Sequence, residues 1–302
     1  MKALKRRICP LCQGEKLLKQ VTCVDHYVTG ESFALLKCER CGFIFTDDAP
    51  DEDHIAPYYA TANYISHSDT SAGCMNSLYH AARQLNLRRK FKLLQRHSKT
   101  QKGNLLDIGT GTGYFPHFVG QKGWNVTALE KNDGARLFAK EHFDLDVLAD
   151  NQWNTLVPNS FDVITLWHVM EHLHDLDKTW EQLTLLLKKE GRLIIALPNP
   201  AAYDAAYYKG DWAAYDVPRH LWHFTASSLQ LLAKRHGFSL EKSYPMPMDA
   251  FYISILSEKY RKHSFSFLRG MYVGLCAFFH SLLNKQRSSS IIYVFKKEKN
   301  EQ

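Results

Sequence analysis

The sequence has no long hydrophobic run. None of its apolar stretches approaches the roughly 20 residues that cross a bilayer, and the basic N terminus leads directly into cysteines without the apolar region of a secretory signal. We therefore expect a cytoplasmic protein. A strong excess of one charge is also missing, since 38 basic residues stand against 31 acidic ones and give a formal net charge of +7. This balance suits an anionic partner and an ordinary lysine-rich surface equally well, so charge does not identify a substrate.

Apolar residues, in contrast, are sufficient for a real core. Hydrophobic residues make up 45% of the 302 residues and aromatic residues 13%, which is enough for one large domain and an accessory module. From the patterns described below we expect a module at 1–48, a linker with cap helices at 49–100, and a main domain at 101–302. A helical insertion is expected at about 248–287 of the main domain.

Four of the seven cysteines form two close pairs, Cys9-Pro-Leu-Cys12 and Cys38-Glu-Arg-Cys41. Each pair places two thiolates on one turn, and two such turns supply the tetrahedral sulfur set that structural zinc prefers. Four ligands leave no open position, so the ion would replace a core that so short a module cannot build. Disulfides are disfavoured in a reducing cytosol, and a redox pair is disfavoured because the pair occurs twice. We predict a zinc ribbon held by Cys9, Cys12, Cys38 and Cys41.

The stretch NLLDIGTGTGYF at 104–115 predicts a buried strand, a glycine turn and the start of a helix. The apolar run at 105–108 is interrupted only by Asp107, which is typical of a strand covered on both faces of a parallel sheet. Glycines at alternate positions let the chain turn sharply and let a ligand approach bare backbone. These glycines are Gly109, Gly111 and Gly113.

A second predicted strand, 124–129, ends at Glu130, about 20 residues beyond the first glycine, where dinucleotide-type folds place an acid on ribose hydroxyls. The nicotinamide fingerprint separates its last two glycines by three positions, whereas this sequence separates them by two and places an acid before the first. The pattern Asp107-x-Gly109-x-Gly111-x-Gly113 resembles motif I of the class I S-adenosylmethionine-dependent methyltransferases.

Two later stretches extend this resemblance. FDVITLWHVMEHLHD at 161–175 closely resembles the sequence after strand four in the methyltransferase subgroup that includes ubiquinone and sugar methyltransferases. DVPRHLWHFT at 216–225 resembles a second signature of that subgroup. The resemblance covers about 57–296. It implies an α/β fold with a doubly wound, seven-stranded, Rossmann-like sheet and S-adenosyl-L-methionine as cofactor.

The resemblance also implies which residues hold the cofactor. Ligands of open α/β sheets lie outside the carboxyl ends of the strands, where Trp167 offers an aromatic wall to adenine or to the positively charged sulfonium. A third short strand at 146–149 ends at Asp150, where the family places an acid or amide on the adenine amino group; Asn151 is the alternative. The expected cofactor-binding residues are Asp107, Gly109, Gly111, Gly113, Glu130, Asp150, Trp167 and His168.

Three residues are candidates for the reaction itself. His172 is able to take a proton from the acceptor near neutral pH, or it only orients its loop by hydrogen bonds. The long polar and aromatic loop at 201–224 is expected to form the acceptor wall, with Arg219 holding a carboxylate or phosphate and His220 or His223 acting as base. A zinc role for these histidines is not expected without a nearby carboxylate pattern. Further candidate contacts, in the segment before the main sheet, are Tyr59, Tyr64 and His67.

The second helix of the insertion carries large apolar residues along one stripe, with basic residues around it. We favour a helix that packs on the domain. The alternative is an interfacial helix at 265–284 that meets a membrane or a lipid-like acceptor.

Three hypotheses about function remain. The first is direct methyl displacement from S-adenosylmethionine to a small-molecule, sugar or glycan, or lipid-like acceptor. The second is an RNA base methyltransferase that uses the ribbon for recognition. The acidic linker at 46–53 and the lack of a clustered basic stripe beyond 88–92 argue against it, so no nucleic-acid partner is expected. The third is a non-catalytic interaction module of the same fold, which the intact glycine motif disfavours.

Overall fold

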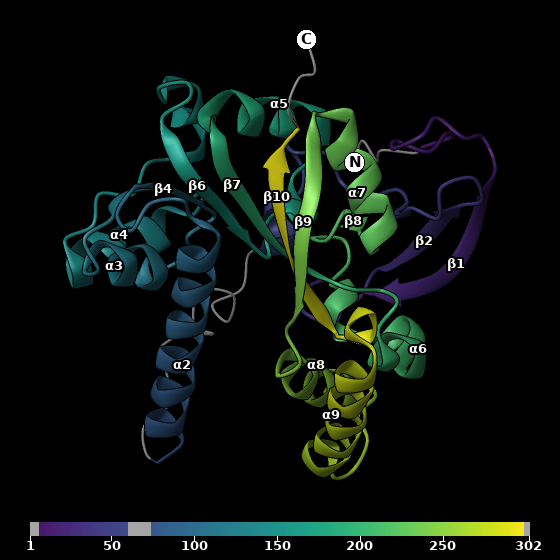
Figure 1. The fold of residues 1–302 in the computed structure, drawn as a ribbon. Helices are drawn as coiled ribbons and strands as arrows, with labels where there is room; N and C mark the ends of the chain where they lie inside the picture. The colour runs from purple at the N-terminus through teal and green to yellow at the C-terminus, as the bar shows by residue number, and fades with distance from the viewer. Residues whose placement is uncertain (1–5, 60–73, 299–302) are drawn as a thin grey trace.

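The structure is a computed structural model that describes residues 6–59 and 74–298 (Figure 1). Its centre is a mixed sheet with the strand order β5-β4-β6-β7-β10-β9. The first four strands are parallel, and β10 is antiparallel to both of its neighbours. The predicted α/β class with a Rossmann-like sheet is confirmed. The strands are β4 (Asn104–Ile108), β5 (Asn125–Leu129), β6 (Phe161–Trp167), β7 (Leu187–Pro198), β9 (Phe238–Pro245) and β10 (Ser290–Lys297).

Helices cover both faces of the central sheet. Successive strand residues alternate between two buried clusters: Leu106 and Leu166 face α5 and α7, whereas Leu105 and Val163 face α2 and α3. A strand covered on both faces has no position at which a side chain reaches water, which explains its continuously apolar sequence. The helices are α2 (Cys74–His97), α3 (Tyr114–Gly120), α4 (Asp133–Phe143), α5 (Leu176–Leu186) and α7 (Ala226–Arg235).

The predicted third strand at 146–149 is not a strand, so the described central sheet has six strands and not seven. Only Leu148 pairs, through a single parallel bridge to Leu129. Asp144 has a positive φ of 49°, and both Asp144 and Asp146 form ion pairs with Lys140 on the surface. Because these acids turn outward to Lys140, the segment cannot lie flat along β5 for more than one residue.

The N-terminal residues form a four-stranded sheet with the order β1-β2-β3-β8. Three strands belong to the predicted ribbon, but β8 comes from the stretch at 216–225 and pairs antiparallel with β3, Phe45 opposite Trp222. The ring of Phe43 lies 5.9 Å from that of Trp222 and 5.3 Å from that of Phe224. The ribbon therefore shares its sheet and its core with the main domain. Its strands are β1 (Leu17–Val24), β2 (Ser32–Cys38), β3 (Ile44–Thr46) and β8 (Trp222–His223).

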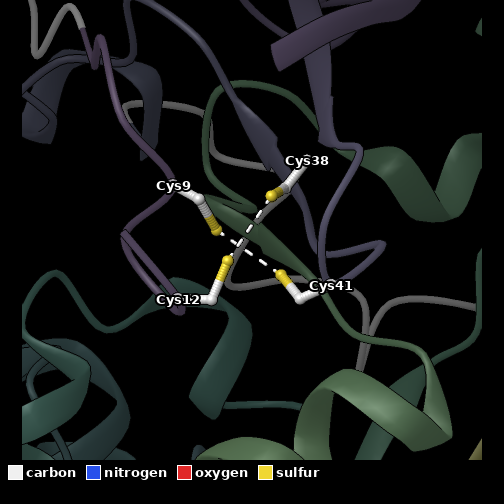
Figure 2. Close-up of side chains that lie close together, drawn as sticks. All are labelled: Cys9, Cys12, Cys38 and Cys41. Atoms are coloured by element: carbon white, nitrogen blue, oxygen red, sulfur yellow. Dashed lines mark hydrogen bonds between the residues drawn. The ribbon is translucent and has the colours of Figure 1, made fainter. Parts of the chain in front are cut away.

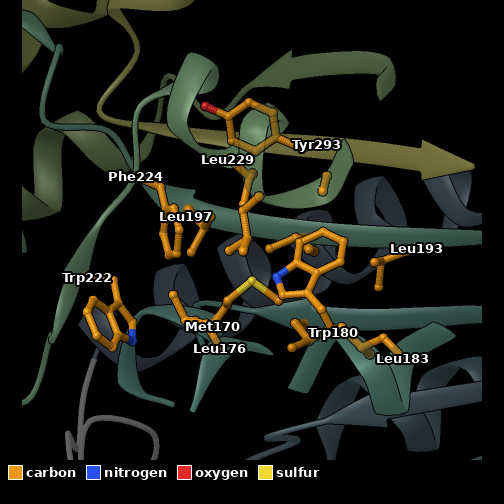
Figure 3. Close-up of a cluster of buried hydrophobic side chains, with 14 of the residues drawn as sticks. Met170, Leu176, Trp180, Leu183, Leu193, Leu197, Trp222, Phe224, Leu229 and Tyr293 are labelled. Carbon is orange, nitrogen blue, oxygen red and sulfur yellow. The ribbon is translucent and has the colours of Figure 1, made fainter. Parts of the chain in front are cut away.

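The segment after β6 is anchored in the core of the molecule. Met170 is fully buried and lies in the same cluster as Trp180 of α5 and Leu197 of β7 (Figure 3). It begins the 3₁₀ helix η3 (Met170–His172). This anchor fixes the two residues that follow, Glu171 and His172, at the carboxyl edge of the sheet.

Two helices inserted between β9 and β10, α8 (Asp249–Tyr260) and α9 (Ser266–Leu283), form an antiparallel pair that extends away from the sheet (Figure 1). A Cβ on Gly270 would lie 2.5 Å from Cα of Ile255, and one on Gly274 would lie 2.9 Å from Cα of Phe251. The backbones of the two helices are thus in close contact. The remaining short helices are η1 (Ala56–Tyr59), η2 (Asp150–Thr155), α6 (Tyr203–Tyr208), η4 (Lys209–Asp211), η5 (Ala213–Tyr215) and η6 (Lys285–Arg287).

Candidate functional site

The glycine turn after β4 has three glycines with positive φ, and their surroundings differ. A Cβ on Gly109 would overlap the side chain of Val169, and one on Gly113 would lie 2.9 Å from Cβ of Ala139. A Cβ on Gly111, whose φ is 58°, would meet nothing within 4 Å. Packing therefore requires the outer two glycines, whereas the middle one presents bare backbone to open space, as a ligand-binding turn does.

Glu130 closes over this turn from the end of β5. Its Oε2 accepts a hydrogen bond of 2.8 Å from the Gly111 N–H, and its Oε1 accepts one of 2.9 Å from the Asn132 N–H. The Glu130 N–H in turn donates to the carbonyl of Leu148, and Asp150 follows two residues later, exposed at the start of η2. The structure thus brings Glu130 and Asp150 to one edge, beside Gly111. Their cofactor contacts stay predictions.

Asp107 lies behind the turn and does not face open space. It is 1% exposed, and its oxygens accept hydrogen bonds of 2.5 Å from the Thr165 hydroxyl and 2.7 Å from the Thr110 hydroxyl. Burial raises the pKa of Asp107 to about 6, against the opposing effect of these hydrogen bonds. The expectation of a direct cofactor contact is corrected: Asp107 ties the glycine turn to β6.

Trp167 is the last residue of β6, and a lysine ammonium group lies over its ring. Lys90 of α2 places Nζ 4.3 Å from the centroid of the Trp167 ring, and burial lowers the pKa of Lys90 to about 8. The sequence showed only that α2 is rich in basic residues. Which of them faces the site depends on how the helix is rotated, so Lys90 was missed.

His168 follows with a positive φ of 58° and lies between two acids. Its Nδ1 is 3.6 Å from Oε1 of Glu171, and its Nε2 is 3.6 Å from Oδ2 of Asp249, the first residue of α8. Burial alone would lower the pKa of His168, but the two acids outweigh it and raise the pKa to about 9. His168 is thus a cation that links the site to the inserted helices.

His172 and His220 meet edge to face, with ring centroids 4.5 Å apart. Each Nδ1 is held by a backbone carbonyl: that of Arg219 lies 3.1 Å from His172 Nδ1, and that of Ala214 lies 2.9 Å from His220 Nδ1. The hydroxyl of Tyr59 also lies 3.1 Å from His172 Nδ1, and its contact with a cofactor or acceptor stays a prediction. Tyr64 and His67 lie outside the described residues.

Glu171 is the carboxylate that the sequence analysis did not find beside these histidines. Its side chain is 1% exposed, and neither of its oxygens has a hydrogen-bond partner among the residues described. Ligand atoms of Glu171, His172 and His220 lie within 4.8 Å of one another. The condition that the sequence lacked for a metal role of these histidines, a nearby carboxylate, is thus present in the structure. The Glu-His pair is adjacent in sequence, but the third member comes from a distant segment.

Arg219 is the candidate that the structure reassigns most clearly. It is 2% exposed, and its guanidinium donates to Asp25 at 3.0 Å, to Asp216 at 2.6 Å and to the carbonyl of Tyr58 at 2.8 Å. These partners come from the ribbon, from its own loop and from η1. With its donors used by the protein and no exposed surface, Arg219 does not hold an acceptor; it joins three segments.

The loop at 201–224 is likewise interior and not an open wall. Trp212, Trp222 and Phe224 are at most 3% exposed. His223, 4% exposed, has Nε2 at 3.1 Å from the Thr46 hydroxyl, and that hydroxyl donates to the carbonyl of His220. Aromatic content that suggested acceptor binding is used to seal the ribbon to the main domain. Of the predicted catalytic residues in this loop, His220 lies beside Glu171 and His172.

The four paired cysteines converge, as Figure 2 shows. Sγ of Cys9 lies 3.6 Å from that of Cys41, and Sγ of Cys12 lies 3.5 Å from that of Cys38. A tetrahedral zinc ion with bonds of about 2.3 Å needs its sulfurs about 3.8 Å apart. In both turns the N–H four residues after the first cysteine donates to the carbonyl of that cysteine at 2.9 Å. The donor set fits a closed structural zinc site.

Comparisons with known proteins agree with this geometry. Residues 79–243 match the model of the methyltransferase domain family. An uncharacterized methyltransferase of Staphylococcus carnosus is 26% identical over 44% of this chain and 64% of its own length. A ubiquinone biosynthesis O-methyltransferase of Pseudomonas aeruginosa is 27% identical over 38% of this chain and 53% of its own length. The chain thus spans between half and two thirds of these relatives.

Among solved structures, an S-adenosylmethionine-dependent methyltransferase of Archaeoglobus fulgidus aligns with 71% of this chain and 94% of its own. The identity is 17% and the TM-score is 0.48. The likeness concerns the fold alone.

Proposed function

We propose, on the premise that the chain belongs to the methyltransferase domain family, that it transfers a methyl group from S-adenosylmethionine to a small-molecule, glycan or lipid-like acceptor. The observation that carries the proposal is the open space in front of Gly111, with Glu130 beside it at the end of the neighbouring strand. An acid at that place is suited to ribose hydroxyls. When the cofactor is bound it supplies an electrophilic methyl group on a sulfonium.

The acceptor side of the proposal rests on the histidines. The attacking atom of the acceptor forms its bond to the methyl carbon while the carbon–sulfur bond breaks, and the acceptor gives up one proton. His172 donates its Nδ1 proton to the carbonyl of Arg219, which leaves the Nε2 lone pair for the site. Burial, with a smaller effect of His220, lowers the pKa of His172 to about 4. His172 is therefore neutral at physiological pH but a weak base, which suits an acceptor whose proton is already acidic.

The inserted helices favour a lipid-like acceptor, because α9 exposes its large apolar residues and buries its small ones. Its large apolar side chains point outward, with Tyr272 70% exposed and Leu268 64% exposed. Its buried face consists mostly of small residues. The buried residues are Gly270, Val273, Gly274, Ala277 and Ser281. The largest exposed side chains besides these two are Phe265, Phe267, Phe279, Leu282 and Leu283.

Charge on the insertion complements an anionic membrane surface. Residues 249–287 contain six lysines and arginines against two acids, and one of these acids, Glu258, is fully buried. Lys259 and Lys262 lie exposed at the outer turn, and Lys285 lies exposed beyond the other end of α9. An apolar face with cations at both ends is typical of a helix that lies in the bilayer interface. We propose that α9 rests on an anionic bilayer.

Contrary to the expectation from the sequence, α9 is long and apolar enough to cross a bilayer by length and composition, and 28% of it is buried. The contact with α8 argues for the surface, because a spanning α9 would take the charged turn at 259–263 through the hydrocarbon layer. The α8–α9 pair begins at Asp249, whose Oδ2 lies 3.6 Å from Nε2 of His168. A membrane-bound acceptor would therefore enter beside the site. The cytoplasmic location expected from the sequence stays a prediction.

Calorimetry and methyl transfer test the activity. Purified protein is expected to bind S-adenosylmethionine and not NAD. With labelled cofactor, it should label the lipid fraction of a cell extract more than the glycan or RNA fractions. Heat from NAD alone would refute the cofactor assignment, and label confined to RNA would establish the alternative of an RNA methyltransferase.

Vesicle binding tests the surface separately. Sedimentation with phosphatidylglycerol vesicles is expected to recover the protein and to fall more than about tenfold in the variant L268E/Y272E, which replaces exposed side chains. Leu137→Glu is the matched control, since Leu137 is 62% exposed on α4 and should bind as the wild type does. Equal binding of all three proteins, or a dimer in solution that L268E/Y272E dissociates, would refute the membrane assignment.

A further inference from the structure

We propose that Glu171, His172 and His220 form a second metal site, which binds a divalent first-row transition ion and leaves coordination positions open to a ligand. The three residues come from η3, after β6, and from the segment that leads into β8. They lie at the carboxyl edge of the central sheet, on the side of the acceptor, and they are separate from the four cysteines.

Glu171 supplies the first argument. Its carboxylate is 1% exposed, yet neither oxygen accepts a hydrogen bond from the described residues. Leaving such a group without partners costs several kcal/mol in an ordinary core, by the general cost of burying an ion. Its backbone is fixed, because its carbonyl accepts the Leu221 N–H at 2.8 Å. The structure thus holds in place a carboxylate that can only accept hydrogen bonds. His168, with Nδ1 at 3.6 Å from Oε1 of Glu171, balances its charge only in part.

The two imidazoles supply the second argument. Histidines that bind metals usually donate their second ring N–H to a carbonyl or carboxylate, which fixes the tautomer and turns the free nitrogen to the ion. His172 and His220 both show this arrangement at Nδ1, which lies at a backbone carbonyl. Nε2 of His220 also lies 3.9 Å from Oδ2 of Asp216, a second carboxylate beside the cluster. Ligand atoms of all three residues already lie within 4.8 Å of one another.

The ligand set indicates the class of ion. Two imidazoles and one carboxylate suit zinc, iron(II), manganese or cobalt, whereas magnesium prefers oxygen ligands and near-octahedral geometry. Three protein ligands also leave at least one position open, in contrast to the closed set of four cysteines. The site is therefore of the kind that binds a further molecule.

The use of the site rests on the proposed function, but the binding of the ion does not. A divalent ion beside the acceptor lowers the pKa of a bound hydroxyl and holds its oxygen toward the methyl group. His172 would then serve as a ligand of the ion and not as the proton acceptor. If methyl transfer fails while the second ion binds, the proposed activity is wrong and the metal site stands.

Metal content provides the test. Full-length protein is dialysed against micromolar Zn²⁺, and bound zinc is measured per chain. We expect two equivalents in the wild type and one in Glu171→Gln and His220→Gln, with the affinity of the second equivalent falling more than about 100-fold, beyond the effect of losing an outer partner. His174→Gln, a change on the same loop outside the cluster, should keep both equivalents.

Thermal unfolding separates a ligand role from a structural one. Zinc should raise the melting temperature of wild-type protein whose ribbon is already loaded, and should not raise that of Glu171→Gln. Without the second ion, Glu171→Gln loses the carboxylate that faces His168 at 3.6 Å, so its own melting temperature is the baseline against which the effect of zinc is measured.

Three results would overturn the proposal. They are a single zinc equivalent in the wild type, two equivalents retained in both ligand variants, and a lower melting temperature of Glu171→Gln with undiminished zinc binding. Retention of Mg²⁺ in preference to Zn²⁺ would refute the class of ion.

Discussion

At the glycine turn and in η3 the chain leaves bare backbone or a carboxylate open, whereas in the loop at 201–224 it covers most polar groups and satisfies them. Gly111 faces empty space, and the nearby Glu171 carboxylate has no hydrogen-bond partner among the described residues. Arg219 and His223, in the loop, are instead buried and bonded to the ribbon. Both regions carry residue types that suit a reaction. What separates them is whether the fold itself uses the polar atoms, because only unused atoms remain for a ligand.

Among the segments whose polar groups are satisfied, the largest effect is expected from removing zinc ligands of the ribbon. Replacing Cys38 and Cys41 together by serine removes half of the sulfur ligands, and structural zinc contributes about 10–16 kcal/mol of binding free energy to small domains. We expect the variant to lose the tightly held zinc and to melt at a lower temperature, since β3 and β8 pair across the junction. Metal analysis and calorimetry measure both. Retained zinc with unchanged melting would show that the ribbon neither binds zinc nor supports the loop.

A more local change tests Arg219. Its replacement by alanine leaves the buried Asp25 and Asp216 unpaired and is expected to cost about 3–5 kcal/mol of the free energy of unfolding. Arg261→Ala, which removes a more exposed pair with Asp211, should cost no more than about 1 kcal/mol. Denaturant unfolding measures both. If Arg219→Ala were stable and only lost turnover, the loop would after all belong to the acceptor site.

At the glycine turn, Gly111→Val should reduce cofactor affinity more than it reduces stability. A branched side chain at φ 58° blocks the approach to the backbone, and we expect cofactor affinity to fall at least about 100-fold, or about 2.8 kcal/mol. Gly30→Val is the control, because Gly30 has a similar φ of 71° and equally open surroundings in the ribbon. Calorimetry with S-adenosylmethionine should show normal affinity for Gly30→Val. Equal losses in the two variants would mean that strain alone explains the effect.

The smallest expected effect concerns Asp107, behind the glycine turn, and the pH dependence of stability. Burial raises the pKa of Asp107 to about 6, from an ordinary value near 4 in the unfolded chain. Between these values the folded protein binds more protons than the unfolded chain, so this group lowers stability as the pH rises from about 4 to 6. The difference in melting temperature between wild type and Asp107→Asn should therefore change across this range. A constant difference would show that Asp107 is accessible to solvent.

Local patterns explain what the sequence predicted well. The buried strands at 105–108 and 161–166 are mostly apolar, and the cysteine pairs and the glycine turn are complete within a few residues. The predicted third strand at 146–149 forms only a single bridge, at Leu148, because Asp144 and Asp146 turn outward to Lys140. These features depend on near neighbours in sequence.

The role of Arg219 depends on a partner that is 194 positions away in the sequence. No local pattern indicates that Asp25, at the tip of a ribbon hairpin, will meet it. Glu171 presents the opposite difficulty, since its importance lies in the hydrogen bonds that it lacks. A missing partner becomes evident only when every neighbour has been placed.

The pairing of β3 with β8 has a consequence for how the protein is made. Thr46 and His223 are 177 positions apart, so a ribosome that adds 5–20 residues per second needs roughly 9–35 s to supply the strand that completes the N-terminal sheet. During that time the nascent ribbon presents an unpaired edge strand with Phe43 and Phe45, which is a template for aggregation. We expect early zinc capture, or a chaperone that shields this edge, to determine the yield of protein in the cell.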